Sequence, residues 1–535
     1  MSSDNKNVFQ KPLKIVVYVI LILFAVSFLP KDQEIAGIQI KYVDILSDLK
    51  PSDEGQNSEE TEKIKSENIQ SDDGFIDPDY VAPDTSSDDG FIDPDYVEPD
   101  TSSEDGFIDP DYVAPDTLSM NEKMGKMQVS SASFGFIEYF YEKAENLLNG
   151  ETAKNDALNY SSGIKLRPQP ITGNVAQLKG FFKALKNSKK KQVRIAHYGD
   201  SIIEGDLITA DFRQRMQSKF GGKGVGFLSI TSQDIQFRVT TKQSFSKTWK
   251  TGSIFANNSS RLPIGIAGTV NVPKGKSWVE FKASRNFRTV KTFTEARLFY
   301  SDAKKSSITY SFKGGKSGKE NLRTGKGLHE TVLRAGRTVS ELKIEFPEKE
   351  QAYFYGVSLE SGNGVYVDNF PLRGNSGVDI QKIDDALLKS FSKKMNYQLI
   401  ILQFGLNAAG TAKSDFSWYE REMVKVINKL KKDFPKAGIL LIAVEDKSEK
   451  KGTQFITDPV VLKLLEAQKN IVRKTKVAFW NLFESMGGKN SMPKWVNSNP
   501  PLAFKDYTHF NGQGAKKVAE MLADALLQAY KKYGK

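Results

Sequence analysis

Much of the chain alternates short apolar runs, typical of buried strands, with longer segments whose apolar residues recur at helical spacing. The expected strands are residues 193–198, 399–402, 438–444 and 477–480. The expected helices are residues 134–148, 175–186, 211–220, 380–390, 418–432, 460–474 and 515–530. Strands that alternate with helices need right-handed crossovers and therefore form a parallel sheet. The pattern predicts an α/β fold.

A different pattern interrupts this alternation. Short segments of alternating apolar and polar residues, separated by Gly, Ser, Asn and Lys, predict strands at residues 278–283, 296–300, 308–312 and 342–346. No helical spacing lies between them. We therefore expect a β-sandwich, at residues 235–354, inserted into the α/β domain.

The N-terminal segment has the pattern of an export signal. Lys11 and Lys14 precede an apolar run at residues 15–29, which fits a signal peptide or a signal anchor. The sequence Ala25-Val26-Ser27 is a weak cleavage site, so we expect an uncleaved anchor in the inner membrane, with residues 1–31 forming a cytoplasmic tail and this anchor. The remainder would then lie on the periplasmic side, as a single-pass membrane protein.

An acidic, repetitive segment follows the expected anchor. A 16-residue motif begins at Ser71, Ser87 and Ser103, with a glycine at the same place in each copy. Repeated prolines and like charges oppose a packed core, so residues 32–126 are expected to be a disordered tether. The expected α/β domain then comprises residues 127–234 and 355–535, on either side of the insertion.

Composition restricts the chemistry and the partners. The chain has no cysteine, which excludes disulfides, thiolate metal sites and a cysteine nucleophile. Residues 45–117 contain 23 acidic and 3 basic residues, so the rest of the chain has a net charge of +31. This charge favours an anionic partner, such as an acidic polysaccharide or the chain's own tether. Nucleic acid is disfavoured because of the export signal and because no recognition motif is present.

Four polar loops are candidates for a reaction centre. They are centred on Ser201, on Gly374, on Asn407 and on the segment from Asp506 to His509. Because they are expected at the carboxyl ends of strands, where open α/β sheets build their sites, they can converge. Acyl transfer needs a nucleophile, a base, a group that orients the base and donors for an oxyanion, and these loops supply one of each.

Each residue also has a purely structural interpretation. The Asp-Ser pair at Ser201 can cap a helix, Asn407 can cap a turn, Gly374 can permit a positive φ, and Asp506 can cap the last helix. His509 is harder to explain in this way. The chain has only 3 histidines, and the other two fall inside an expected strand and inside the insertion. His509 is therefore the best candidate for a base near neutral pH.

Together the four ordered blocks resemble the SGNH (GDSL) hydrolase family over roughly residues 192–530. The resemblance implies a flavodoxin-like three-layer α/β/α fold that needs no cofactor or metal. It further implies Ser201 as nucleophile, His509 as base and Asp506 as its orienting group, with the Ser201 and Gly374 N–H groups and the Asn407 side chain as oxyanion donors. The insertion resembles the carbohydrate-binding-type module of peptidoglycan O-acetylesterases in this superfamily. The third block reads Gly-Leu-Asn, without the acidic residue that commonly follows, and Glu204 or Asp206 is a candidate for setting the substrate's charge preference.

These observations lead to three functional hypotheses. The first is an exported, membrane-tethered serine esterase that removes O-acetyl groups from a cell-envelope glycan. The second is a polysaccharide O-acetyltransferase that uses the same acyl-serine step. The third is a non-catalytic glycan-binding protein, in which aromatic residues of the insertion form a platform for sugars. These aromatic residues are Trp249, Trp278, Tyr300 and Tyr310.

Overall fold

The computed structural model describes residues 34–35, 38–39, 166–235, 237–254, 258, 260–347, 352–409 and 415–534. The expected anchor, the repeats and the expected helix at residues 134–148 lie outside these residues. Between residues 34 and 39 only two short paired strands are described, β1 (Glu34–Ile35) and β2 (Ile38–Gln39). No helix in the described part of the chain has both the length and the apolar character needed to cross a membrane.

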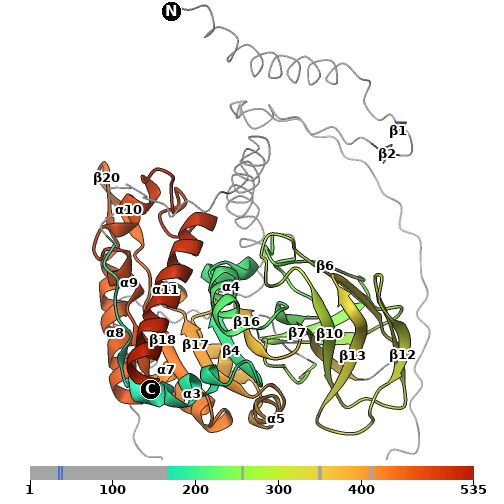
Figure 1. Ribbon diagram of the computed structural model, residues 1–535. Coiled ribbons are helices and arrows are strands. Elements are labelled where there is room, and N and C mark those ends of the chain that lie inside the picture. Colours follow the sequence, from blue (N-terminus) through green and yellow to red (C-terminus); the bar gives the residue numbers. More distant parts are fainter. Residues whose placement is uncertain are drawn as a thin grey trace, which may run out of the picture. The chain divides into compact units, whose positions relative to one another are not determined.

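A six-stranded sheet is the centre of the α/β region (Figure 1). Five of its strands are parallel, and β3 pairs antiparallel at one edge. In spatial order the strands are β16 (Gly364–Pro371), β4 (Gln192–Gly199), β17 (Tyr397–Gln403), β18 (Gly438–Ile442), β21 (Ala478–Trp480) and β3 (Thr172–Gly173). Numbered along the chain, the parallel strands have the order 2-1-3-4-5, which is that of flavodoxin-like folds. The predicted α/β class with a parallel sheet is therefore confirmed.

Successive residues of the central strands enter two different apolar clusters. Leu399 and Ile401 belong to one cluster, whereas Ile400 and Leu402 belong to the other. The first cluster contains residues of α3 (Lys179–Lys186), α4 (Thr209–Phe220) and α11 (Gly512–Tyr533). The second contains residues of α5 (Asp385–Met395), α7 (Ser417–Asp433) and α8 (Pro459–Thr475). Because strand side chains alternate between faces, the two sets of helices cover opposite faces of the sheet.

Shorter elements complete the α/β region. They are η2 (Val175–Leu178), η3 (Ser201–Asp206), η4 (Val378–Lys382), α6 (Leu406–Ala409), α9 (Leu482–Met486), α10 (Ser491–Val496) and the hairpin of β19 (Ser448–Lys451) and β20 (Gln454–Thr457). The helix expected at residues 175–186 is in fact η2 followed by α3. The helix expected at residues 380–390 is likewise divided into η4 and α5.

Two antiparallel sheets lie between β4 and β16 in the chain, and their strands are green to yellow in Figure 1. One contains β13 (Leu328–Val339), β10 (Phe293–Ser301), β15 (Tyr353–Glu360), β8 (Thr269–Pro273) and β7 (Trp249–Ser253), with β5 (Gly226–Ser229) paired to β15. The other contains β12 (Ser317–Asn321), β11 (Ser307–Phe312), β14 (Glu341–Glu345), β9 (Trp278–Ala283) and β6 (Thr241–Phe245). Residues of both sheets share a third apolar cluster.

The four aromatic residues expected to form a platform for sugars are not all accessible to a ligand. Tyr300 is completely buried, and the ring of Trp249 packs edge-on against Phe346 and Phe354. These two aromatic side chains contribute to the interior of the insertion, as large aromatic residues commonly do. The expectation that all four rings could stack on sugars is therefore wrong for Tyr300.

Candidate active site

The first candidate residue lies where β4 ends. Asp200 precedes η3, and its carboxylate accepts a hydrogen bond of 3.1 Å from the Ile202 N–H, so the capping interpretation of this turn holds. A side chain at Gly199 would lie 2.9 Å from both the Gln403 carbonyl and the Ile203 side chain. This close approach leaves room only for glycine before the turn. The half-buried Ser201 is thereby held at the carboxyl end of the sheet.

A hydrogen-bonded chain of three side chains begins at Ser201. Its Oγ lies 3.2 Å from Nε2 of His509, and Nδ1 of the same ring lies 2.7 Å from Oδ2 of Asp506. The other carboxylate oxygen of Asp506 accepts the backbone N–H groups of Thr508 at 2.9 Å and His509 at 3.0 Å. The backbone of its own loop thus holds the Asp506 carboxylate in place beside the His509 ring. These are the contacts that a nucleophile, a base and an orienting acid require.

The two ionisable members of this chain shift each other's pKa. Burial by itself would raise the pKa of Asp506, but the hydrogen bond and charge of His509 hold it below its usual value. Burial by itself would lower the pKa of His509, but the hydrogen bond and charge of Asp506 raise it above its usual value. Asp506 therefore favours the imidazolium form, which is the form a base adopts after it takes a proton.

Gly374 and Asn407 lie in the same cavity as the serine. This cavity has a volume of about 540 Å³, and its lining includes Ser201, Gly374, Asn407, Asp506 and His509. The structure therefore brings together all five residues singled out in the sequence.

Two of the three oxyanion candidates, Gly374 and Asn407, have backbone or side-chain geometry that suits a donor. Gly374 has φ of +72°, and a side chain there would meet no atom within 4 Å, so its backbone borders open space. The Asn407 amide donates to the Asn375 carbonyl over a distance of 3.3 Å. Asn375 itself accepts a 2.7 Å bond from the Gly377 N–H, which orders the loop behind Gly374. The two donors are thus carried on loops that other hydrogen bonds hold in place.

Three further carboxyl groups line the cavity. Burial raises the pKa of Asp200 to about 6, and burial raises the pKa of Glu204 to about 7. Burial, together with the neighbouring Asp200 carboxylate, raises the pKa of Glu445 to about 8. Sequence reasoning missed Glu445. Its place three residues after the end of β18 is the signal that identifies it, because site residues gather at the carboxyl ends of parallel strands.

Glu204 and Asp206 have different environments. Glu204 lines the cavity and forms an ion pair of 2.8 Å with Arg373, a residue next to Gly374 that sequence reasoning gave no role. Asp206 is completely buried and pairs with Arg213 at 2.6 Å. Asp206 is therefore not part of the cavity wall, and its suggested influence on substrate charge is wrong.

The remaining histidines do not reach this cavity. His197 is fully buried between Gln403 and Thr209, each 3.0 Å from one of its ring nitrogens. Burial lowers its pKa to about 4, so it is neutral at physiological pH. His329 bonds to the Gly325 carbonyl in the insertion. Of the three histidines, only His509 is in reach of Ser201.

Comparison with solved structures finds this fold in a peptidoglycan O-acetylesterase. A peptidoglycan O-acetylesterase superposes with a TM-score of 0.56 at 21% identity, covering 68% of this chain and 99% of the other. An acetyl xylan esterase has a TM-score of 0.25 at 18% identity, covering 30% of this chain and 81% of the other. A carbohydrate esterase family 2 enzyme with a carbohydrate-binding domain, from Corynascus thermopiles (Myceliophthora fergusii), has a TM-score of 0.24 at 13% identity over 48% of this chain and 94% of its own. No protein-family model and no curated protein matches the chain.

Proposed function

Starting from the SGNH/GDSL hydrolase-like fold of this chain, we propose that it is a serine esterase that removes O-acetyl groups from a cell-envelope glycan. The observation that carries the proposal is the chain of hydrogen bonds from Ser201 through His509 to Asp506, in a cavity that also contains Gly374 and Asn407. Such an intact arrangement favours catalysis over a purely sugar-binding role.

The proposed reaction has two halves. His509 takes the proton of Ser201 as its oxygen attacks the acetyl carbonyl, and the negative charge on the carbonyl oxygen is stabilised by Gly374 and Asn407. The imidazolium then protonates the departing sugar oxygen, leaving an acetyl-serine. In the second half His509 removes a proton from water, which attacks the acetyl-serine and releases acetate, and the proton returns to Ser201.

The glycan class and the cellular location extend this proposal. An O-acetylated peptidoglycan is favoured as substrate because the superposed enzyme of the same fold is a peptidoglycan O-acetylesterase. The apolar run at residues 15–29 supports attachment to the inner membrane, with the esterase on the periplasmic side. We further propose that the two antiparallel sheets form a β-sandwich of the carbohydrate-binding type, since they share one apolar cluster.

Hydrolysis of p-nitrophenyl acetate tests the central assignment. Ser201→Ala should abolish turnover while thermal unfolding stays near that of the wild type, because the change removes only one half-buried hydroxyl. Ser498→Ala is a matched control, since this serine is also half-buried and lies outside the cavity. A fluorophosphonate probe should label Ser201 in the wild type. Turnover retained by Ser201→Ala, or labelling at another serine, would refute the proposal.

A further inference from the structure

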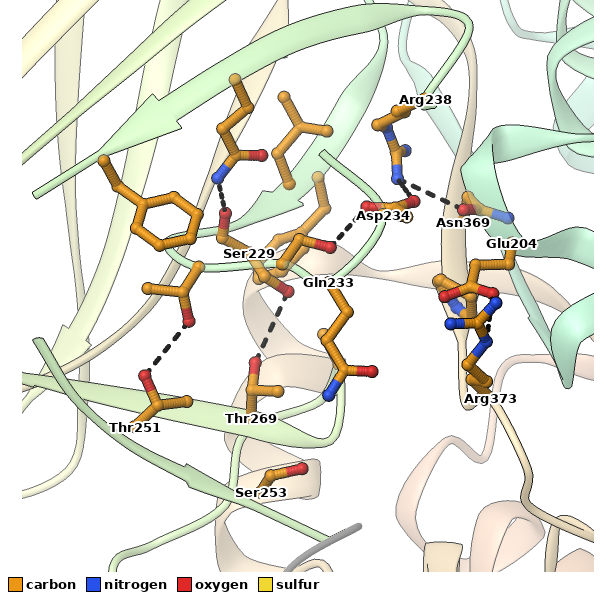
Figure 2. Close-up of a pocket in the computed structure, with 18 residues that line it drawn as sticks. Glu204, Ser229, Gln233, Asp234, Arg238, Thr251, Ser253, Thr269, Asn369 and Arg373 are labelled. Atoms are coloured by element: carbon orange, nitrogen blue, oxygen red, sulfur yellow. Dashed lines mark hydrogen bonds and ion pairs between the residues drawn. The ribbon is translucent and has the colours of Figure 1, made fainter. Parts of the chain in front are cut away.

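Figure 2 shows a second cavity, of about 290 Å³. It adjoins the proposed catalytic cavity, because two residues line both. One part of its wall comes from the antiparallel sheets, including Thr251 on β7 and Thr269 on β8. Another part comes from the end of β16 and the loop after it, where Asn369 and Arg373 lie. Its volume lies just below the roughly 300–1,000 Å³ typical of ligand pockets.

The charged residues of this wall neutralise one another. Asp234 pairs with Arg238 at 3.0 Å, and Glu204 pairs with Arg373 at 2.8 Å (Figure 2). Asp234 also accepts hydrogen bonds from Ser232 and from the Gly205 N–H. Because each charged side chain in the lining is paired within the protein, the lining leaves no unpaired charge for a charged ligand to neutralise.

Hydroxyl and amide groups dominate the rest of the polar lining. They include those of Ser229, Thr231, Thr251, Thr269 and Gln233. Gln233 is exposed, and its amide has no hydrogen-bond partner among the residues the structure describes (Figure 2). Phe227 and Phe245 add apolar surface to the same wall. An uncharged sugar ring has both hydroxyl groups and apolar C–H faces, and this lining offers partners for both.

The two cavities share one part of their walls. Glu204 and Arg373 line both of them. Glu204 lies on η3 with Ser201, three residues further on, and Arg373 is the residue before Gly374. A ligand in the second cavity would therefore lie beside the ion pair that also borders the catalytic cavity.

We propose that the second cavity is a glycan subsite, which binds an uncharged pyranose ring of the same chain whose acetylated residue occupies the catalytic cavity. This inference rests on the proposed esterase function and adds to it a reason for the insertion, whose strands build part of the subsite. Gln233 is the specificity-determining residue, because its free amide can donate to and accept from sugar hydroxyls.

Binding by the full chain carrying Ser201→Ala tests the subsite without requiring turnover. The probe is the linear tetramer of N-acetylglucosamine, titrated calorimetrically. Adding Gln233→Trp, which fills the cavity, should weaken binding about tenfold, the effect of losing roughly one hydrogen bond and its contact area. Asn321→Trp is the matched control, since Asn321 is an exposed amide on β12 that lines neither cavity. The subsite would be overturned if Ser201→Ala/Gln233→Trp and Ser201→Ala/Asn321→Trp bound the tetramer equally well. It would also be overturned if Ser201→Ala alone did not bind the tetramer.

Kinetics separate this inference from the proposed function. In an otherwise wild-type chain, Gln233→Trp and Gln233→Ala should raise KM for the chemically O-acetylated tetramer and leave p-nitrophenyl acetate hydrolysis unchanged. A parallel loss on both substrates would mean that Gln233 affects the reaction centre or the fold, which contradicts a subsite. Failure of the esterase proposal would give a different result, namely p-nitrophenyl acetate turnover that survives Ser201→Ala.

Discussion

Asp506 determines both the orientation and the charge of His509. The carboxylate lies 2.7 Å from Nδ1, and this contact leaves Nε2 directed at Ser201. It is also the main reason why the pKa of His509 is raised against the effect of burial. The proposed base and the carboxylate proposed to orient it are therefore coupled through one hydrogen bond.

A prediction about pH follows from this pair. His509 accepts a proton only when its imidazole is neutral, so kcat/KM for p-nitrophenyl acetate should rise with pH, with a midpoint above the usual value of 6.5. Asp506→Asn removes the carboxylate that raises the pKa, so the midpoint should move to lower pH. The same change should reduce kcat by on the order of 10⁴-fold, because the ring loses its preferred tautomer. A pH–rate profile of both proteins checks this, and an unshifted midpoint would contradict it.

Asn407 provides a second test at the scale of single residues. Its amide is the only side-chain donor assigned to the oxyanion, so Asn407→Ala should lower kcat roughly 100-fold and change KM little. Asn470→Ala is a suitable control, because its amide bonds to Glu420 outside the cavity. Initial rates at saturating p-nitrophenyl acetate give kcat directly. A loss confined to KM would assign Asn407 to ground-state binding instead.

At the scale of elements, the strand β16 shows what sequence patterns conceal. It has Asp368 and Asn369 in its interior, and we did not predict it as a strand. Both are buried, where Asp368 accepts bonds from Arg194 and Tyr397, and Asn369 donates to the Ile203 carbonyl. A strand whose polar side chains find their partners on distant segments has no recognisable apolar period.

The start of α11 corrects one structural interpretation. Asp506 does not cap this helix; Asn511 does, accepting bonds of 3.0 Å from the N–H groups of Gln513 and Gly514. Asp506 is thereby free to orient His509. The cap and the candidate base are separated by one residue, so the helix start fixes the loop that carries His509.

Asn511→Ala should therefore lower the free energy of unfolding by about 1 kcal/mol, the usual effect of losing a side-chain cap. Asn511→Asp keeps an acceptor at the same place and should lose less, since only the bond from its amide to the Pro501 carbonyl disappears. Urea denaturation followed by circular dichroism measures both. Equal destabilisation by the two variants would mean that the bond to Pro501, rather than the cap, stabilises this end of the helix.

At the scale of the whole molecule, a buried ionic network joins the parallel sheet to the antiparallel sheet that contains β10 and β15. Arg194 on β4 contacts Asp368 on β16 at 2.9 Å and Glu360 on β15 at 2.5 Å. Glu360 also pairs with Arg297 on β10 at 3.3 Å. Arg194, Asp368 and Glu360 are at most 1% exposed. The two regions are thus connected by charges that water does not reach.

Arg194→Met should destabilise the protein by about 3–5 kcal/mol, because it leaves the buried Asp368 without its arginine and Glu360 with Arg297 alone. The matched control is Lys343→Met, which removes the exposed ion pair with Glu345 and should cost at most about 1 kcal/mol. Thermal and urea unfolding of the two variants give the comparison. A change of less than about 1 kcal/mol in Arg194→Met would show that the network contributes little to stability.

The sequence by itself determined the α/β class, most helices and strands of the parallel sheet, and the five residues that the structure finds in one cavity, although their catalytic roles remain predictions. These features depend on local periodicity and on loops at strand ends, both of which can be read from neighbouring residues. Only the tertiary structure decided that Arg373 lines the cavity, that Asp206 does not, and that a second cavity adjoins the first. Each of these depends on which distant segments pack together, and side-chain burial and pairing across such segments leave no trace in local sequence.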